Sequence, residues 1–350
     1  MVPAMSKTIG VLTGGGDCPG LNAVIRAIVK RSLPRGNRIV GMLDGWAGLL
    51  ENRTRELDPE SVSGIIHVGG TIIGTSRTNV LKDQATIDLA FQRVRELKLD
   101  GLIAIGGEGT LTVSAKLASL GMPVVGVPKT IDNDINETDY TFGFNTAVEI
   151  ATEAIDRLHT TAESHRRVMV VEVMGRHAGW IATYAGIAGG ADVILVPEYS
   201  MSVEEIVGII EDRKARGRRF SIVVVAEGAK IKRNGAEQGV ARDRKDPFGR
   251  PLLGGIGQVL ADEIEASTGM ETRVTVLGHV QRGGSPTALD RVLATRLGAF
   301  AADLAHEGRW GMMPSLKGTR IEAAPLSNAT SSLKLVDPEL WGLARSFFGL

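Results

Sequence analysis

Short apolar segments recur along the chain and predict buried strands. They are five or six residues long, rich in β-branched side chains and apolar on both faces, which is typical of strands in a parallel sheet that helices cover on both sides. The predicted strands span residues 8–13, 38–43, 101–105, 122–127, 168–173, 192–196, 221–226 and 273–277.

Helical periodicity lies between these strands. Leu21, Val24 and Ile28 fall on one face of a helix, because residues three and four apart share a face when the period is 3.6. The same spacing predicts helices around residues 148–158, 203–210 and 289–300, and a last helix over 338–347. Strands that alternate with helices predict an α/β protein with doubly wound parallel sheets.

Two places along the chain suggest how it is divided. A long helix begins near residues 142–145, which makes this the best candidate for a domain boundary. Residues 228–252 predict an irregular segment, because they are rich in glycine and charge. We therefore expect two Rossmann-like domains that face a cleft.

Composition narrows the class of protein. A chain of 350 residues with 43% hydrophobic residues can bury a sizeable core, and 40 basic residues balance 40 acidic ones, so no overall field attracts nucleic acid or a membrane surface. No apolar run is long enough to span a bilayer, and residues 1–7 lack a signal-peptide core. The single cysteine, Cys18, is interpreted as structural and fits a reducing cytoplasm.

Three glycine-rich loops follow predicted strands. Residues 14–20 open a helix, residues 106–110 do the same and add the carboxylate of Glu108, and residues 69–77 end in Arg77. Backbone amides at a helix N-terminus bind anions, and a carboxylate can hold Mg²⁺. One such loop is as compatible with a tight turn as with a ligand, but three together predict a polyphosphate site.

Two familiar phosphate motifs are absent from the first loop. The dinucleotide fingerprint needs glycine where this chain has Pro19, and the Walker loop needs lysine where it has Leu21. The sequence therefore argues against hydride transfer and against a P-loop enzyme.

A polar segment, VPKTIDND at residues 127–134, leaves the predicted strand 122–127. If the backbone stayed extended, Thr130, Asp132 and Asp134 would point to one side and Lys129 to the other. Two carboxylates beside a hydroxyl suit a general base and a metal partner. The alternative is a surface turn, because Asp and Asn favour turns.

Cationic and polar groups follow strands in the second half of the chain. They lie in the segments 174–180 and 278–284 and at Glu227. Arginine and imidazole side chains suit a phosphomonoester, and a carboxylate accepts hydrogen bonds from sugar hydroxyls. We expect these groups to line the facing wall of the cleft.

Arg167 and Arg273 stand apart, since each opens its predicted strand. They would therefore lie at the edge of the sheet opposite to the cleft of the same subunit. Either they reach the site of a neighbouring subunit or they are solvated charges, and the residues alone favour the solvated charges.

Five motifs together resemble the phosphofructokinase family. They are GGGDCPGLN at 14–22, GGEGT at 106–110, PKTIDND at 128–134, MGRHAG at 174–179 and GHVQRGGSP at 278–286, and they extend over nearly the whole chain. The resemblance implies the phosphofructokinase fold and transfer of the γ-phosphoryl group of ATP to O1 of fructose 6-phosphate with Mg²⁺. It also implies an allosteric homotetramer. A cytoplasmic protein with no nucleic-acid or membrane partner is already expected from the composition.

The resemblance further implies two discontinuous domains. The larger, donor-binding domain would comprise residues 1–143 and about 281–331. The smaller domain, which binds fructose 6-phosphate, would comprise about 144–280 and 332–350.

Catalytic roles are implied residue by residue. Asp132 resembles the general base that takes the proton from the sugar hydroxyl, and Asp134 is its neighbour in the catalytic loop. Thr130 would contact the transferring phosphoryl group, and Arg176 would stabilise the transition state. Such a reaction depends on positioning and on charge stabilisation.

Binding roles are implied in the same way. The residues that resemble donor contacts are Gly15, through its amide, Arg77, Lys82, Glu108, Gly109, Thr110 and Lys129, with Glu108 at the Mg²⁺ position. Those that resemble contacts of fructose 6-phosphate are Thr130, Asp132, Arg167, Met174, Gly175, Arg176, Glu227, Arg273, His279 and Arg282. Arg167 and Arg273 match the pair that relatives lend across a subunit interface, which overturns the interpretation as solvated charges.

Residues 109 and 129 do not point to the same phosphate donor. Pyrophosphate-dependent relatives typically carry Asp where this chain has Gly109 and Lys where it has Lys129, whereas the best-known bacterial ATP-dependent type has Gly at both. An Asp at 109 would fill and negatively charge the space that an α-phosphate needs, so Gly109 favours ATP. Lys129 does not by itself exclude ATP, because the combination of Gly109 and Lys129 resembles that of actinobacterial ATP-dependent members. A pyrophosphate-dependent enzyme and a non-catalytic sugar-phosphate sensor remain as alternatives.

Overall fold

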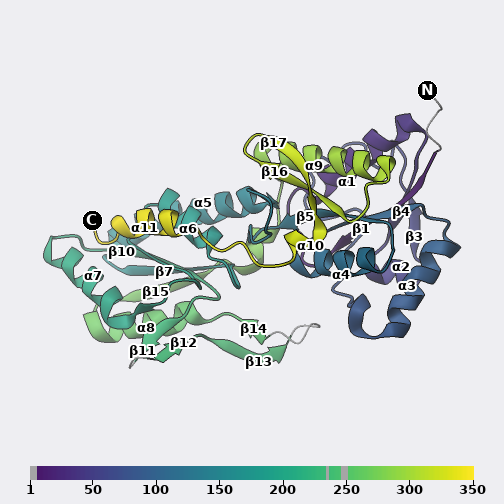
Figure 1. Ribbon diagram of the computed structural model, residues 1–350. Helices are drawn as coiled ribbons and strands as arrows, with labels where there is room; N and C mark the ends of the chain where they lie inside the picture. Colours follow the sequence, from purple (N-terminus) through teal and green to yellow (C-terminus); the bar gives the residue numbers. More distant parts are fainter. Residues whose placement is uncertain (1–5, 234–235, 246–250) are drawn as a thin grey trace. The chain divides into compact units, whose positions relative to one another are not determined.

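The computed structural model describes residues 6–233, 236–245 and 251–350 (Figure 1). The chain divides into two compact units. Unit 1 comprises Met1–Ile131, Ile135–Thr146 and Arg282–Leu333, and unit 2 comprises Asp132–Asp134, Ala147–Gln281 and Lys334–Leu350. The predicted strand 192–196 and the other seven all correspond to observed strands, although most boundaries shift by one to three residues.

Unit 1 is built on a six-stranded sheet in the order β3-β2-β1-β4-β5-β6. All neighbours are parallel except β3, which is antiparallel to β2. The strands are β1 (Thr8–Gly14), β2 (Arg38–Met42), β3 (Thr54–Glu56), β4 (Gly101–Gly106), β5 (Val124–Thr130) and β6 (Phe142–Gly143). This order reverses direction at β1 and β4, the position where doubly wound sheets bind ligands.

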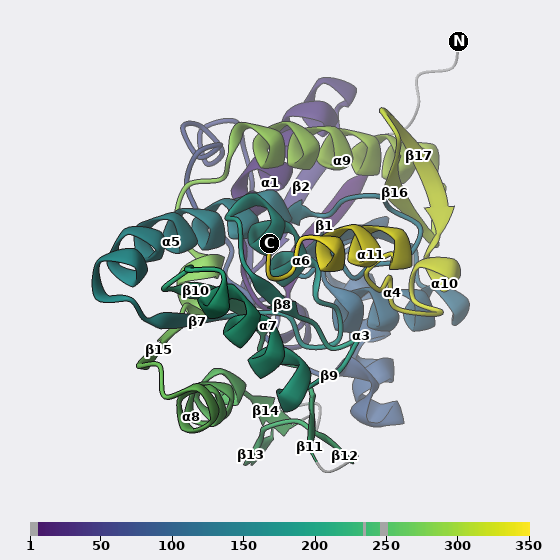
Figure 2. The ribbon, with the colours of Figure 1, turned by 90° about the vertical axis from the view of Figure 1, so that its left-hand side faces the viewer.

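Helices cover both faces of this sheet. One face packs its apolar residues against α2 (Trp46–Leu50), α3 (Gln84–Glu96) and α4 (Glu108–Ser119). On the other, α1 (Leu21–Ser32) and α9 (Ala288–Glu307) lie side by side (Figures 1 and 2). Their approach depends on Gly298, since a Cβ there would lie 2.6 Å from the carbonyl oxygen of Val24. A hairpin of β16 (Met312–Lys317) and β17 (Arg320–Pro325) and the short helix α10 (Leu326–Ala329) complete the unit.

Unit 2 is built on a four-stranded parallel sheet in the order β15-β7-β10-β8. Its strands are β15 (Thr272–Val276), β7 (Val168–Val173), β10 (Ser221–Ala226) and β8 (Val193–Leu195). One apolar face packs against α7 (Val203–Ala215) and α8 (Ile256–Thr268). The remaining helices are α5 (Phe144–His165), which begins in unit 1, α6 (Trp180–Ala188) and α11 (Pro338–Ser346).

Local chemistry explains several helix starts. Ser202 and Glu205 form a reciprocal capping box at the start of α7, and the side chains of Asp83, Thr287 and Asp337 accept hydrogen bonds from the first turns of α3, α9 and α11. Such caps satisfy backbone amides that have no partner within the helix. The predicted last helix over 338–347 is α11, which has proline in its first turn.

The expected irregular segment at 228–252 was only partly right. It contains the short strands β11 (Ile231–Arg233), β12 (Ala236–Gln238), β13 (Ala241–Lys245) and β14 (Pro251–Leu253). Strand β11 pairs with β12 and with β9 (Met201–Ser202), and β13 pairs with β14. These pairings are antiparallel apart from β11 with β9, and short charged strands of this kind carry no strong apolar alternation. Residues 234–235 and 246–250 lie outside the described part of the chain.

Within the described residues, no helix combines the length and apolar character needed to cross a lipid bilayer.

Candidate functional site

In unit 1, two of the three glycine-rich loops are joined to each other. The N–H of Gly15 donates to the carbonyl of Ser76 at 2.9 Å, and the Thr75 hydroxyl donates to the carbonyl of Gly15 at 2.8 Å. Gly15 lies at φ 80°, in the left-handed region that favours glycine. The Gly15 amide, which we expect to contact a phosphate, is hydrogen-bonded to Ser76 in this conformation.

Asn22 holds the loop 69–77 from the other side. Its buried side chain donates to the carbonyl of Val68 at 3.0 Å and accepts from the N–H of Ile72 at 2.8 Å. The sequence motif at 14–22 contains Asn22, but sequence reasoning assigned it no role. Arg77 at the end of the loop is exposed, as is Lys82 in the 3₁₀ helix η2 (Val80–Lys82).

The loop after β4 forms the N-terminus of α4. Glu108 is the first residue of that helix, Gly109 follows it, and Thr110 is buried against the ends of β1 and β4. A Cβ on Gly14 would lie 2.5 Å from Thr110 Oγ1, and a Cβ on Gly106 would lie 2.3 Å from Thr110 Cβ. Two of the glycines are thus required by the position of Thr110.

The surroundings of Glu108 fit a metal ion that is held mainly by the phosphate oxygens of a bound substrate. Its carboxylate is half-buried and accepts a hydrogen bond from the Thr112 hydroxyl at 3.4 Å. In the part of the chain that the structure describes, no group of three or more His, Cys, Asp and Glu side chains could hold a metal ion. Mg²⁺ at phosphoryl-transfer sites is held by one or two carboxylates together with phosphate oxygens, so a single carboxylate is compatible with it.

Lys129 and Thr130 lie on a strand and not in a loop, because β5 continues to Thr130. Lys129 is only 3% exposed, and its ammonium group donates to the carbonyl of Gly16. The Thr141 hydroxyl donates to the carbonyl of Thr130 at 2.8 Å. Lys129 therefore fastens the first glycine-rich loop to the sheet.

Arg282 also contacts this loop. Its Nη1 donates to the carbonyl of Asp17 at 3.2 Å, and a Cβ on Gly16 would lie 2.7 Å from the same nitrogen. The sequence grouped Arg282 with His279 as contacts of the sugar phosphate. In unit 1, however, its guanidinium contacts the loop that is expected to hold the phosphate donor.

Cys18 is a buried residue of the first loop, and its thiol donates to the carbonyl of Phe142 at 3.6 Å. Burial raises the pKa of this thiol to about 12, although Lys129 and Arg282 act in the opposite direction. The reactive thiolate is therefore about one part in 10⁴ at pH 8. This supports the interpretation of Cys18 as a structural residue.

We expect Ellman's reagent at pH 8 to label Cys18 at least ~100-fold more slowly in the folded protein than in guanidinium chloride, because burial removes both access and thiolate. The denatured protein is the internal control and should release one thiol per chain. Equal labelling rates in the two states would show that Cys18 is as accessible and as readily ionised in the folded protein as in the unfolded chain.

The segment after β5 does not stay extended. Asn133 adopts φ 51°, so the extended backbone on which the alternation of Thr130, Asp132 and Asp134 depends is not present. In unit 2, Lys334 fixes this turn: its ammonium donates to Asn133 Oδ1 at 3.0 Å and its N–H donates to the carbonyl of Asp134 at 2.9 Å. Asp132 is half-buried in this turn.

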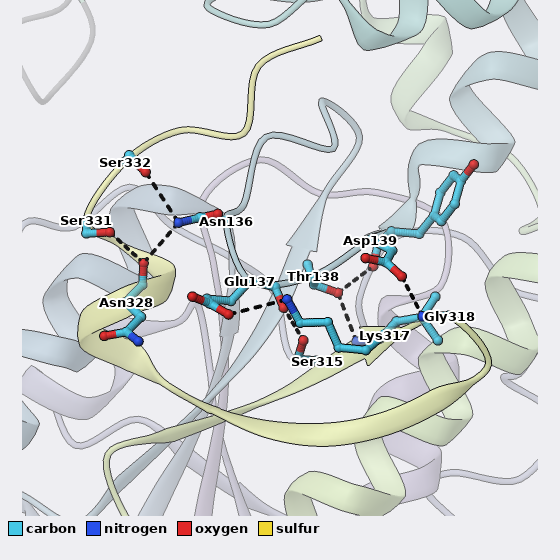
Figure 3. Close-up of polar contacts among 12 residues, drawn as sticks. Asn136, Glu137, Thr138, Asp139, Ser315, Lys317, Gly318, Asn328, Ser331 and Ser332 are labelled. Carbon is cyan, nitrogen blue, oxygen red and sulfur yellow. Dashed lines mark hydrogen bonds and ion pairs between the residues drawn. The ribbon is translucent and has the colours of Figure 1, made fainter. Parts of the chain in front are cut away.

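The residues that follow the turn are anchored within unit 1 (Figure 3). Lys317 pairs with Glu137 at 3.3 Å, and the N–H of Gly318 donates to the Asp139 carboxylate at 2.6 Å (Figure 3). The β16–β17 hairpin therefore holds the chain directly after the polar segment 127–134. These contacts restrict the position of that segment.

In unit 2, the chain segments after β7 and β10 lie together. The N–H of Glu227 donates to the carbonyl of Val173 at 2.8 Å, and that of Gly228 donates to the carbonyl of Gly175 at 3.0 Å. A Cβ on Gly228 would lie 2.0 Å from the carbonyl oxygen of Arg176, so glycine is required there. The structure thus brings Met174, Gly175 and Arg176 next to Glu227, as the sequence suggested.

His279 follows β15 in the 3₁₀ helix η3 (Gly278–Arg282) and is exposed. The neighbouring Gln281 is fully buried. The sequence pointed to His279 because its imidazole suits a phosphomonoester and Arg282 and two glycines accompany it. It assigned no role to Gln281, whose only signal was an amide side chain inside the motif.

Arg167 and Arg273 lie at the amino ends of adjacent strands, as predicted from the sequence. The ladder between β15 and β7 pairs Thr272 with Val168, and Arg167 directly precedes Val168. Arg167 Nε contacts the Glu271 carboxylate at 2.5 Å, and Arg273 also pairs with Glu271. The hydrogen bond from Arg167 lowers the pKa of Glu271, so one carboxylate holds both arginines.

Comparison with known proteins identifies the family. The family model described as Phosphofructokinase matches residues 8–305. A pyrophosphate--fructose 6-phosphate 1-phosphotransferase of Amycolatopsis methanolica is 56% identical, over 97% of this chain and 99% of the relative. An ATP-dependent 6-phosphofructokinase of Corynebacterium efficiens is 52% identical, over 97% of this chain and 99% of the relative.

The solved structures agree with the sequence comparison. The crystal structure of Pichia pastoris phosphofructokinase in the T-state matches with a TM-score of 0.82 and 30% identity, over 99% of this chain and 37% of that longer chain. The α/β fold predicted from the sequence is thereby confirmed. The chain belongs to the phosphofructokinase family.

Proposed function

We propose that this phosphotransferase is an ATP-dependent 6-phosphofructokinase, which converts fructose 6-phosphate and ATP into fructose 1,6-bisphosphate and ADP. The single observation that carries the choice of ATP is Gly109, in the first turn of α4, directly after Glu108. A residue without a side chain at this helix N-terminus leaves room for the phosphates of a nucleotide.

The donor side of the proposed site belongs to unit 1. The joined loops around Gly15 and Arg77 support a polyphosphate, with Lys82 and Thr110 as further candidates. Glu108 would hold Mg²⁺, which neutralises phosphate charge in such reactions. The amide of Gly15 would contribute only if its bond to Ser76 opened.

The acceptor side is proposed to include Met174, Gly175, Arg176, Glu227 and His279, which follow β7, β10 and β15. Asp132 would accept the proton of the O1 hydroxyl while that oxygen bonds to the γ-phosphorus and the bond to the β-phosphate oxygen breaks. Thr130 and Arg176 would stabilise the transferring phosphoryl group, and Asp134 would support the catalytic turn. Arg282 is proposed as a further acceptor contact, provided that its guanidinium leaves Asp17.

Lys129 bears on the choice of donor. Relatives of both donor classes match at similar identity, 56% and 52%, and Lys129 is the residue that pyrophosphate-dependent proteins share. Here it donates to the carbonyl of Gly16, a structural role in the first glycine-rich loop that either donor would allow. The lysine is therefore compatible with ATP as the donor.

To test the donor, purified protein is incubated with fructose 6-phosphate, Mg²⁺ and either ATP or pyrophosphate, and the formation of fructose 1,6-bisphosphate is measured. We expect fructose 1,6-bisphosphate with ATP. Turnover with pyrophosphate alone would reject the proposed donor, and turnover with neither donor would favour a sugar-phosphate sensor.

Gly109→Asp should impair turnover with ATP much more than any turnover with pyrophosphate, because the new carboxylate fills and charges the space of the α-phosphate. The kcat/KM for each donor measures this effect. Gly208→Asp is the matched control, since Gly208 lies in α7 with open space beside it. Equal losses with both donors would contradict the steric argument.

We also propose a homo-oligomer, a tetramer by family resemblance, in which Arg167 and Arg273 serve the site of a neighbouring subunit. Their place at the amino ends of β7 and β15, opposite to the strand ends that carry Met174 and His279, supports this arrangement. Hybrids of Arg273→Ala subunits with Asp132→Asn subunits should regain part of the activity that each variant lacks. Verified hybrids without recovery would argue against shared sites.

A further inference from the structure

Gln281 joins two chain segments of unit 2. Its fully buried side chain accepts a hydrogen bond from the N–H of Met174 at 3.4 Å through Oε1, and it donates to the carbonyl of Gly278 at 3.2 Å through Nε2. Met174 directly follows β7, and Gly278 begins η3 after β15. One amide thus bridges the two strand ends.

The bridge lies where the regular sheet has ended. The ladder between β15 and β7 runs from Thr272 to Val276, and the N–H of Leu277 still donates to the carbonyl of Glu172 at 3.0 Å. Beyond this point both segments turn in backbone conformations that favour glycine, with Gly175 at φ 140° and Gly278 at φ 50°. Their separation is therefore not fixed by β-pairing, and the Gln281 amide spans it.

At neutral pH an amide of this length supplies both halves of the bridge. The N–H of Met174 is buried and needs a partner, and the carbonyl of the half-buried Gly278 accepts the other hydrogen bond. Glutamate would offer an acceptor but no donor when ionised, and methionine of similar volume would offer neither. Loss of the bridge leaves Met174 N–H and Gly278 C=O to find other partners, and each unsatisfied group is costly when buried.

We propose that Gln281 is a positioning residue for the sugar-phosphate site. It holds Met174 and the adjoining Gly175 and Arg176 at a fixed distance from His279, so that both segments can contact the same acceptor molecule. The inference rests on the proposed acceptor, fructose 6-phosphate. Gln281 is buried and acts through the backbone of these segments, without itself contacting the sugar.

The first test compares Gln281→Met with the wild type. We expect the KM for fructose 6-phosphate, and its Kd measured by calorimetry without donor, to rise about tenfold, which is the effect of losing roughly one hydrogen bond of positioning. The KM for the phosphate donor should stay within about twofold, since the donor residues belong to unit 1. A merely structural role would alter both constants together.

Two further variants complete the design. Gln258→Met is the matched control, because Gln258 is an exposed residue of α8 whose amide contacts only Asp262 in the hydrogen bonds described, at 2.8 Å. Gln281→Glu keeps the acceptor for the N–H of Met174. This variant should bind fructose 6-phosphate more tightly at a pH low enough to protonate the new glutamate than at a pH where the glutamate is ionised, because the protonated acid also donates to the carbonyl of Gly278. This pH-dependent rescue provides a second readout if the methionine variant folds poorly.

The outcomes separate the two proposals. If the wild type binds fructose 6-phosphate and Gln281→Met binds it equally well, the positioning role is wrong while the proposed function stands. If the wild type does not bind fructose 6-phosphate in the presence or absence of donor, the proposed acceptor is wrong, and the positioning role is rejected with it.

Discussion

Asp132→Asn should lower kcat by about 10²- to 10⁴-fold, the usual contribution of a general base. Asparagine has nearly the same shape as aspartate but cannot take the proton from the O1 hydroxyl. The KM values and the directly measured affinities for both substrates should change little, because the groups that position them remain. Steady-state kinetics together with calorimetry distinguish these effects.

Asp139→Asn is the matched control for this experiment. Asp139 is an exposed carboxylate seven residues further along the same connection, and it accepts a hydrogen bond from the N–H of Gly318 at 2.6 Å (Figure 3). It should retain nearly normal kcat. If Asp132→Asn weakened substrate binding and left kcat intact, Asp132 would be a binding residue and not the base.

Asp192→Ala should reduce the free energy of unfolding by about 3–5 kcal/mol, the typical cost of leaving one buried charge without its partner. Asp192 contacts Arg213 at 2.8 Å, and the two side chains are only 11% and 6% exposed. Burial raises the pKa of Asp192 and lowers that of Arg213, so each charge is unfavourable alone. Urea denaturation, followed by far-UV circular dichroism, measures the loss.

Two further variants test whether the loss comes from the buried charge. Replacing Arg213 by methionine in the Asp192→Ala background should recover part of the stability, because this removes a buried cation whose remaining partners are the Ser221 hydroxyl and the Leu350 carbonyl. Glu56→Ala breaks the exposed pair of Arg38 and Glu56, whose side chains are 56% and 60% exposed, and should change stability little. Similar small losses in all variants would contradict the buried-charge argument.

Sequence patterns predicted the central strands of unit 2 best. The predicted strands 168–173 and 221–226 coincide with β7 and β10, because these strands are buried on both faces and their apolar composition marks both ends. Polar or glycine-rich elements were missed. Helix α4 was expected to follow the loop at 106–110, but it begins inside the motif GGEGT, at Glu108, and its small and polar residues gave no helical periodicity that could locate its start. Helices α3 and α8 carry many charges and were also missed.

The amino-acid sequence by itself determined the α/β class, the family and the residue types available for phosphoryl transfer. Only the tertiary structure decided which partners these residues have. The carbonyl bound by Lys129 lies 113 residues away in sequence, and that bound by Arg282 lies 265 residues away. No local pattern encodes such contacts, because they arise when separate strand ends meet.

The segment 127–134, which predicted an active-site loop, also shows what the sequence determined and what the tertiary structure decided. Its composition identified Asp132 as a candidate base, but the turn at Asn133 overturned the extended geometry. Lys129, a candidate phosphate contact by its chemistry, also donates to the Gly16 carbonyl. The Gly15 amide changed from an available donor into one bonded to Ser76. Sequence specifies chemical groups, whereas long-range packing specifies which of them remain available to a substrate.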